Sequence, residues 1–158
     1  MKLLVVSALL CGLMVLTTAA SKRHLVKRST GCPFGWTRNS DRCFLFVPTA
    51  MSWARAERNC LSMGANLASV HSGNEYKTIQ SLTAPHGNPK TWIGGTDAPQ
   101  DFIWLWSDGT SFHYSSWCPG EPNNDRGQHC IQMNYGGSKG WDDVQCNEHL
   151  PSVCAKKV

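Results

Sequence analysis

Apolar residues early in the chain recur with the period of a helix. Positions three and four residues apart predict one buried stripe between Ala50 and about Met63, with Thr49 as the N-cap and Gly64 at the end. The stripe consists of Trp53, Ala56, Cys60 and Met63. A first amphipathic helix is therefore expected here, with its charged residues facing solvent.

The rest of the pattern predicts a second helix and then short strands. Ser72 is followed three residues later by Glu75, the spacing of a capping box at a helix N-terminus. Short apolar runs without helical period predict strands at 42–47, 66–70, 91–95, 102–106, 131–135 and 152–155, the first ended by Pro48. The sequence thus favours an α+β fold. Between the last strands, residues 107–129 are rich in Gly, Pro, Ser and Asn, and loops of this length usually carry function.

Ahead of these elements lies a leader. Residues 1–20 have a positive start, an apolar run over 3–16 and small residues at the end, as in a secretory signal peptide. The run is shorter than the roughly 20 residues of a membrane-spanning helix, so we expect a secreted, extracellular protein with no transmembrane segment. Residues 21–31 form a basic N-terminal segment, either a propeptide or a solvated tail. Residues 32–158 then suit one domain.

Charge and histidine content exclude two classes of function. Five of the fifteen Lys and Arg residues precede Cys32, whereas all eleven Asp and Glu residues follow it, so the domain itself is nearly neutral. We therefore expect no nucleic-acid partner. Of six histidines, His129 lies near the acidic loop, and nothing pairs it with a nucleophile. The sequence indicates a binding protein, not an enzyme.

Seven cysteines follow the leader, which indicates a disulfide framework plus one odd thiol. Zinc is disfavoured because the chain has no C-x-x-C pair. Spacing alone does not fix the pairing. One arrangement that the spacing allows joins Cys32 to Cys43, Cys60 to Cys154 and Cys130 to Cys146. Cys118 is left over, either buried and inert or joining two chains in a disulfide-linked homodimer.

Oxygen-bearing side chains gather on two neighbouring segments of the loop region. They are Glu121, Asn123, Gln128, Asp142 and Asp143. None is a thiol or an imidazole, which favours a hard cation, and Ca²⁺ takes six to eight oxygen ligands of this kind. These five residues are the expected metal ligands.

Taken together, these features resemble the C-type lectin-like domain, over essentially all of residues 32–158. The motifs that carry the resemblance are Trp92-Ile93-Gly94-Gly95, Trp104-x-Trp106-Ser107-Asp108-Gly109, Glu121-Pro122-Asn123 and Trp141-Asp142-Asp143, together with the cysteine order and the helix from Trp53 to Cys60. The resemblance implies two helices, two small antiparallel sheets and a long loop with a Ca²⁺ site. It also implies a cis bond before Pro122.

In that family Ca²⁺ takes two neighbouring sugar hydroxyls, and the side chains that hold the ion also hydrogen-bond those hydroxyls. The resemblance therefore implies carbohydrate binding by Glu121, Asn123, Gln128 and Asp142, in innate recognition of glycans. The Glu-Pro-Asn triplet is the mannose type. In the second ligand pair, however, Gln128 and Asp142 exchange the usual acid and amide. Because amides donate whereas carboxylates accept, our hypothesis is a donor arrangement that also tolerates galactose.

Two alternatives share this fold. Type II antifreeze proteins of fish resemble the chain at Ser116-Trp117-Cys118 and Trp141-Asp142-Asp143, and bind ice instead of sugar. Their extra cysteines are missing here, where His129 and Gly140 stand at the corresponding places. Venom-type lectin-like proteins bind protein targets and often lose the Ca²⁺ ligands, which this chain keeps.

Overall fold

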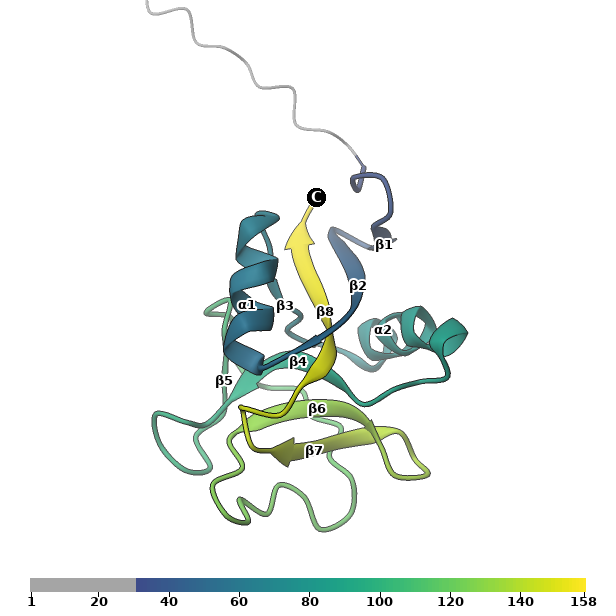
Figure 1. Cartoon of the computed structure of the whole chain (residues 1–158). Helices are drawn as coiled ribbons and strands as arrows, with labels where there is room; N and C mark the ends of the chain where they lie inside the picture. The colour runs from purple at the N-terminus through teal and green to yellow at the C-terminus, as the bar shows by residue number, and fades with distance from the viewer. Residues whose placement is uncertain (1–30) are drawn as a thin grey trace, which may run out of the picture.

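The computed structural model describes residues 31–158 (Figure 1). The expected signal peptide, and all of the basic segment except Gly31, lie outside these residues. In chain order the elements are β1 (Thr37–Asn39), β2 (Arg42–Met51), α1 (Trp53–Ser62), β3 (Asn66–Leu67), α2 (Gly73–Thr83), the 3₁₀ turn η1 (Ala84–His86), β4 (Thr91–Thr96), β5 (Leu105–Trp106), β6 (Cys130–Tyr135), β7 (Gly140–Val144) and β8 (Leu150–Lys157). None of the described helices is long and apolar enough to cross a membrane.

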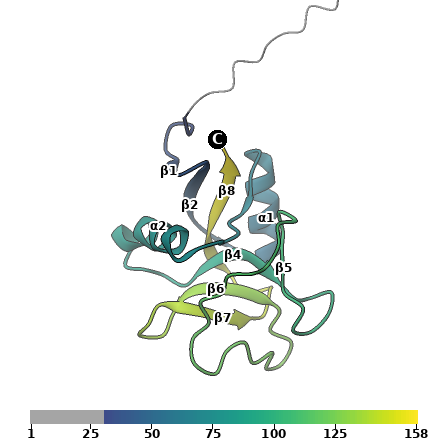
Figure 2. The same ribbon diagram turned by 180° about the vertical axis from the view of Figure 1, so that it is seen from behind.

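The strands form one connected sheet made of two antiparallel groups. The order is β1-β2-β8-β4-β6-β7, with β3 beside β8 and β5 beside β4. The groups meet where β4 runs parallel to β8, with Trp92 opposite Ser152. In Figures 1 and 2 the helices lie on either side of β2 and β8, and β6 and β7 lie at the end away from the C-terminus. The α+β class is confirmed, and the two expected sheets are joined by this short parallel contact.

The first helix begins later than the pattern predicts. Its N-cap is Ser52, not Thr49, because β2 continues through Pro48 to Met51. Pairing between β2 and β8 is irregular between Val47 and Met51, so the missing N–H of Pro48 falls where the ladder is interrupted. The second helix starts as predicted, with Ser72 Oγ accepting from the Glu75 N–H at 3.2 Å. The Glu75 carboxylate reaches back to the His71 N–H, one residue before the cap, at 2.7 Å.

Several strand assignments differ from the expectation. The short β1 was not predicted, and only Asn66 and Leu67 of the stretch 66–70 form a strand. The stretch 102–106 pairs with β4 only at Leu105 and Trp106, while Phe102 lies in a turn, Ile103 follows it, and both are exposed. Conversely, β7 was not predicted, since its centre reads as a polar motif. It forms because Trp141 inserts into the core and packs edge-on against five aromatic rings, those of Tyr76, Trp106, Phe112, Tyr114 and Trp117.

Three disulfides fasten the fold. They join Cys32 to Cys43, Cys60 to Cys154 and Cys130 to Cys146, the arrangement expected from the sequence. Cys118 is the free cysteine of the described chain and is only 6% exposed. Its thiol lies 3.3 Å from both the Tyr135 carbonyl and Ser138 Oγ. A buried thiol of this kind does not favour a disulfide to a second chain.

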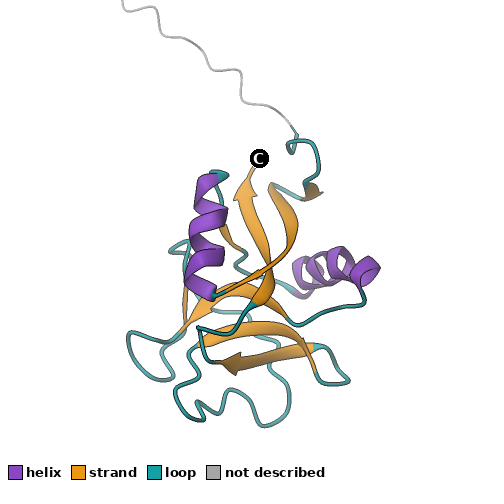
Figure 3. Cartoon of the chain, in the orientation of Figure 1, coloured by secondary structure: helices purple, strands orange, loops and turns teal. Residues whose placement is uncertain are grey.

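Figure 3 shows where the long loops of the domain lie. Loop segments collect beyond β6 and β7, and among them is the stretch between β5 and β6 that contains Glu121. The Cys130–Cys146 disulfide ties the start of β6 to the residues after β7. This disulfide thus fixes the end of the loop before β6 next to the residues that follow β7, and the sequence predicts the binding site on these two segments.

Candidate cation and ligand site

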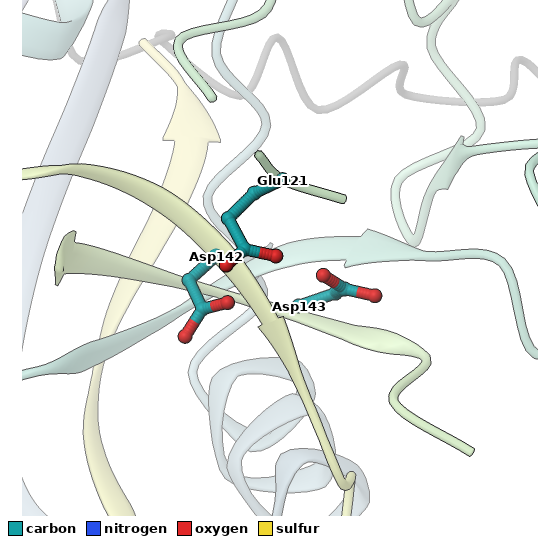
Figure 4. A group of neighbouring side chains, drawn as sticks. All are labelled: Glu121, Asp142 and Asp143. Carbon is teal, nitrogen blue, oxygen red and sulfur yellow. The ribbon is translucent and has the colours of Figure 1, made fainter. Parts of the chain in front are cut away.

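Three carboxylates meet at the outer edge of the sheet. Asp142 and Asp143 are consecutive on β7, and Glu121 reaches them from the loop, as Figure 4 shows. Each offers an oxygen, and these oxygens lie within 4.8 Å of one another. In the register between β6 and β7, Asp142 lies opposite Gln132 and Asp143 opposite Ile131, and the two side chains leave β7 on opposite faces. Glu121 therefore completes a cluster that β7 alone does not provide.

Asp143 also fixes the shape of the loop. Its two carboxylate oxygens accept the backbone N–H groups of Asn123 at 3.0 Å and Asn124 at 2.7 Å. Asn123 Oδ1 in turn accepts the Asp125 N–H at 2.8 Å. The Glu121–Pro122 bond is cis, as the resemblance implies. A fully buried aspartate on a strand thereby holds the Glu-Pro-Asn turn against the sheet.

The second aspartate of β7 is held from the neighbouring strand. Gln132 Nε2, on β6, donates to Asp142 Oδ2 at 2.6 Å. Both side chains are nearly inaccessible to solvent, with Gln132 2% and Asp142 5% exposed. The amide orients this carboxylate through a charge-assisted hydrogen bond.

The cluster is electrostatically unfavourable by itself. Burial raises the pKa of Glu121 to about 7, and the negative charges of Asp142 and Asp143 add to this effect. The pKa of Asp142 is also raised, chiefly by burial. A bound cation relieves such repulsion, because it stabilises the ionised form of every carboxylate around it.

Several oxygens of the loop are buried without a hydrogen-bond partner in the described chain. They are Glu121 Oε2, Asn124 Oδ1 and Gln128 Oε1. Buried polar atoms in native proteins are nearly always paired, so these acceptor oxygens are available to a donor or to an ion. Carboxylate and amide oxygens suit Ca²⁺, and the residues present fit that ion.

Only some of the five predicted ligands converge on one point in the structure. Glu121, Asp142 and Asp143 converge, whereas Asn123 is exposed and its side-chain oxygen is engaged by the backbone of Asp125. Gln128 lies on the same loop with its carbonyl oxygen buried. The assignment of all five to one ion stays a prediction.

Sequence reasoning missed Asp97, a fully buried carboxylate that joins two loops. Its Oδ1 lies 2.9 Å from His129 Nδ1, and its Oδ2 accepts Asn124 Nδ2 at 3.0 Å and the Phe102 N–H at 2.7 Å. The Asp97 N–H also donates to the His129 carbonyl at 3.1 Å. The position of Asp97 directly after the buried strand 91–96 was the available sign, since a polar residue there faces the neighbouring loops.

Comparison with known proteins identifies the family. The model of the family described as "Lectin C-type domain" matches residues 49–156. Ladderlectin of Oncorhynchus mykiss is 49% identical over 80% of this chain and 68% of its own length. The galactose-specific lectin nattectin of Thalassophryne nattereri is 38% identical over 85% of this chain and 87% of its own.

Among solved structures, the herring type II antifreeze protein is 42% identical, with a TM-score of 0.77 over 80% of this chain and 99% of its own. The similarity therefore extends both to sugar-binding lectins and to ice-binding proteins. The fold, the disulfides and the matched residues agree with one another, and the chain belongs to the C-type lectin domain family.

Proposed function

We propose that this protein is a secreted, Ca²⁺-dependent carbohydrate-binding lectin. The observation that carries the proposal is the group of three carboxylates within 4.8 Å, next to buried acceptor oxygens that lack partners. Glu121, Asn123, Gln128, Asp142 and Asp143 would hold the ion. When bound, Ca²⁺ supplies two coordination positions for neighbouring sugar hydroxyls.

The protein's own residues set the hydrogen bonding around a sugar. Ionised carboxylates of Glu121 and Asp142 only accept, whereas the amides of Asn123 and Gln128 both donate and accept. Each ligand pair thus contains an acid and an amide, which matches the two lone pairs and one proton of a hydroxyl. No bond of the sugar is made or broken, so the activity is binding and not catalysis.

Galactose acceptance is the specificity that we favour over strict mannose selection. The exchange of acid and amide at Gln128 and Asp142 moves a donor from one side of the site to the other. The similarity to a galactose-specific lectin supports the same direction. A glycan array probed in Ca²⁺, with free mannose and free galactose as competitors, tests it. We expect galactose to compete at concentrations no higher than those that mannose requires. A clear preference for mannose would contradict galactose acceptance.

Ice binding is the second candidate function, favoured by the similarity to the herring antifreeze protein. The discriminating measurement is thermal hysteresis of the purified protein, made beside the glycan array. A lectin shows Ca²⁺-dependent sugar binding and no hysteresis. Hysteresis without sugar binding would reverse the assignment.

A further inference from the structure

A pocket of about 590 Å³ is lined by none of the expected Ca²⁺ ligands. Its lining includes Arg42 of β2, Glu75 of α2, Asp108 after β5, and His71 just before α2. Arg42 Nη1 donates to Glu75 Oε1 at 2.9 Å, and Arg42 Nη2 lies 4.0 Å from Asp108 Oδ2. A strand, a helix and a loop are thus held together around a histidine.

The hydrogen bonds around His71 assign its tautomer. The hydroxyls of Ser69 and Thr110 each donate their single proton to the Asp108 carboxylate, at 2.5 and 2.6 Å. Both hydroxyl oxygens also lie close to His71 Nε2, at 3.0 and 3.2 Å. Since their protons are already engaged, these oxygens accept from the ring, and Nε2 carries the hydrogen. The other ring nitrogen, Nδ1, is therefore bare, and it is buried without a hydrogen-bond partner among the described residues.

This assignment requires Asp108 to be ionised. Burial opposes ionisation, but the hydrogen bonds from Ser69 and Thr110 and the charge of Arg42 outweigh it, and the pKa of Asp108 is lowered. Asp108 is therefore a carboxylate at neutral pH, and its oxygens only accept.

We propose that His71 makes the contact between residues 107–113 and the start of α2 sensitive to acid, because a proton on Nδ1 loosens that segment. The inference goes beyond the proposed function, since it involves neither Ca²⁺ nor a sugar.

The physical reason is that the second proton has no favourable place. It would create a buried N–H donor without an acceptor and a positive charge near Arg42. The ring of His113 stacks on that of His71, with centroids 5.4 Å apart and planes at 16°, so two protonated rings would repel each other. Glu75 and Asp108 are the opposing negative charges, and both are already bonded to other groups.

The balance of these effects has a defined sign. Burial, followed by the charge of Arg42, lowers the pKa of His71 below its ordinary value of 6.5. A conformation in which the ring is free therefore takes up the proton more readily than the closed one. Closure is fully favoured above about pH 6.5 and weakens as the pH falls through the pKa of the folded state.

Amide hydrogen exchange tests the proposal in the part of the segment that has backbone donors. The Gly109 N–H donates to the Trp106 carbonyl and the Thr110 N–H to Asp108 Oδ1, both at 3.0 Å. After correction for the intrinsic exchange rate, their protection in Ca²⁺-free buffer should fall about 3- to 10-fold between pH 7 and pH 5. One proton changes it by at most about tenfold per pH unit.

The variant His71→Gln separates titration from packing. Its amide nitrogen retains a donor toward Ser69 and Thr110 but takes up no proton in this range, so the loss of protection should disappear. His149→Gln, which changes an exposed histidine, should show the same loss as the natural protein. Unchanged protection in the natural protein, or an equal loss in His71→Gln, overturns the proposal.

A nuclear magnetic resonance titration of the natural protein gives a second test that depends on no variant. The ring of His71 should titrate at lower pH than that of the exposed His149, and its nitrogen shifts should show a hydrogen on Nε2. A midpoint at or above that of His149, or a hydrogen on Nδ1, would also overturn the proposal. Neither result bears on Ca²⁺ or sugar binding, which is measured separately.

Discussion

Glu121 shares its surroundings with two aspartates, and this sets how the site responds to pH. Its pKa is raised to about 7 by burial and by the charges of Asp142 and Asp143. A raised carboxyl pKa means that the proton is held up to neutral pH in the metal-free protein. Protonated Glu121 is a poor ligand, so Ca²⁺ binding must release that proton.

Ca²⁺ affinity should therefore rise with pH. With a pKa of about 7, the ionised fraction of Glu121 increases about tenfold from pH 6 to pH 8, and so does the apparent affinity. Titrations at several pH values measure it. Glu121→Gln should bind more weakly and lose most of this dependence. Affinity in the natural protein that stays constant over this range contradicts the account.

Gly140 is a second position where a change at one residue should have a measurable effect, here on stability. A Cβ at this position would lie 2.7 Å from the Ser116 carbonyl oxygen and 2.8 Å from Cys118 Sγ. Gly140→Ala should destabilise the protein by about 1–3 kcal/mol, because a backbone carbonyl must move. Gly137→Ala is the matched control, since nothing lies within 4 Å of its Cβ. Urea unfolding of the two variants distinguishes them, and equal stability would show that the strand relaxes freely.

Two loops and one strand depend on each other through Asp97. Its carboxylate links the turn that contains Phe102 to the segment from Asn124 to His129. Because the Asn124 N–H also donates to Asp143, we expect a change at Asp97 to affect the carboxylate cluster.

Asp97→Ala should leave three donors without their acceptor and cost about 2–4 kcal/mol of stability, with weaker Ca²⁺ binding. Asp101→Ala, whose side chain is 70% exposed, should change neither quantity appreciably. Thermal unfolding with and without Ca²⁺ separates the two effects. If Asp97→Ala keeps full Ca²⁺ affinity, the hydrogen bonds of Asp97 have no part in Ca²⁺ binding.

Elements with a clear hydrophobic period were predicted well, and elements shaped by long-range contacts were not. The α2 cap follows directly from Ser72 and Glu75. By contrast, β7 depends on the insertion of Trp141 among rings from distant segments, and its acidic residues hide the strand pattern. Phe102 and Ile103 have the apolar pattern of a buried strand, but both are exposed, and the Phe102 N–H is bonded to the Asp97 carboxylate instead of to a strand.

The candidate site could be predicted where its residues belong to local motifs, and not where they meet through long-range packing. Glu121, Asp142 and Asp143 stand in a recognisable motif order, and the structure brings them together. Asp97 carries no motif, and its role exists only because β4 ends beside the loop. Short-range spacing shows which residues are available to a cation, while packing decides which of them converge.

At the scale of the whole molecule, the burial of Cys118 bears on assembly. Cys118 as a residue is only 6% exposed, which shields it from a second chain, so the protein should migrate as a monomer on gels run with and without reductant. Cys118→Ser should migrate in the same way. A dimer band that appears only without reductant, and is lost in Cys118→Ser, would instead support the interchain disulfide considered from the sequence.

The central claim is that the loop beside β7 holds Ca²⁺ and that sugar binding requires the ion. Calorimetric titration of Ca²⁺ into the metal-free protein, followed by galactose and mannose, tests it most directly. The account predicts saturable Ca²⁺ binding and then sugar binding that disappears in EDTA. Absence of Ca²⁺ binding, or sugar binding that is equally strong in EDTA, would contradict it.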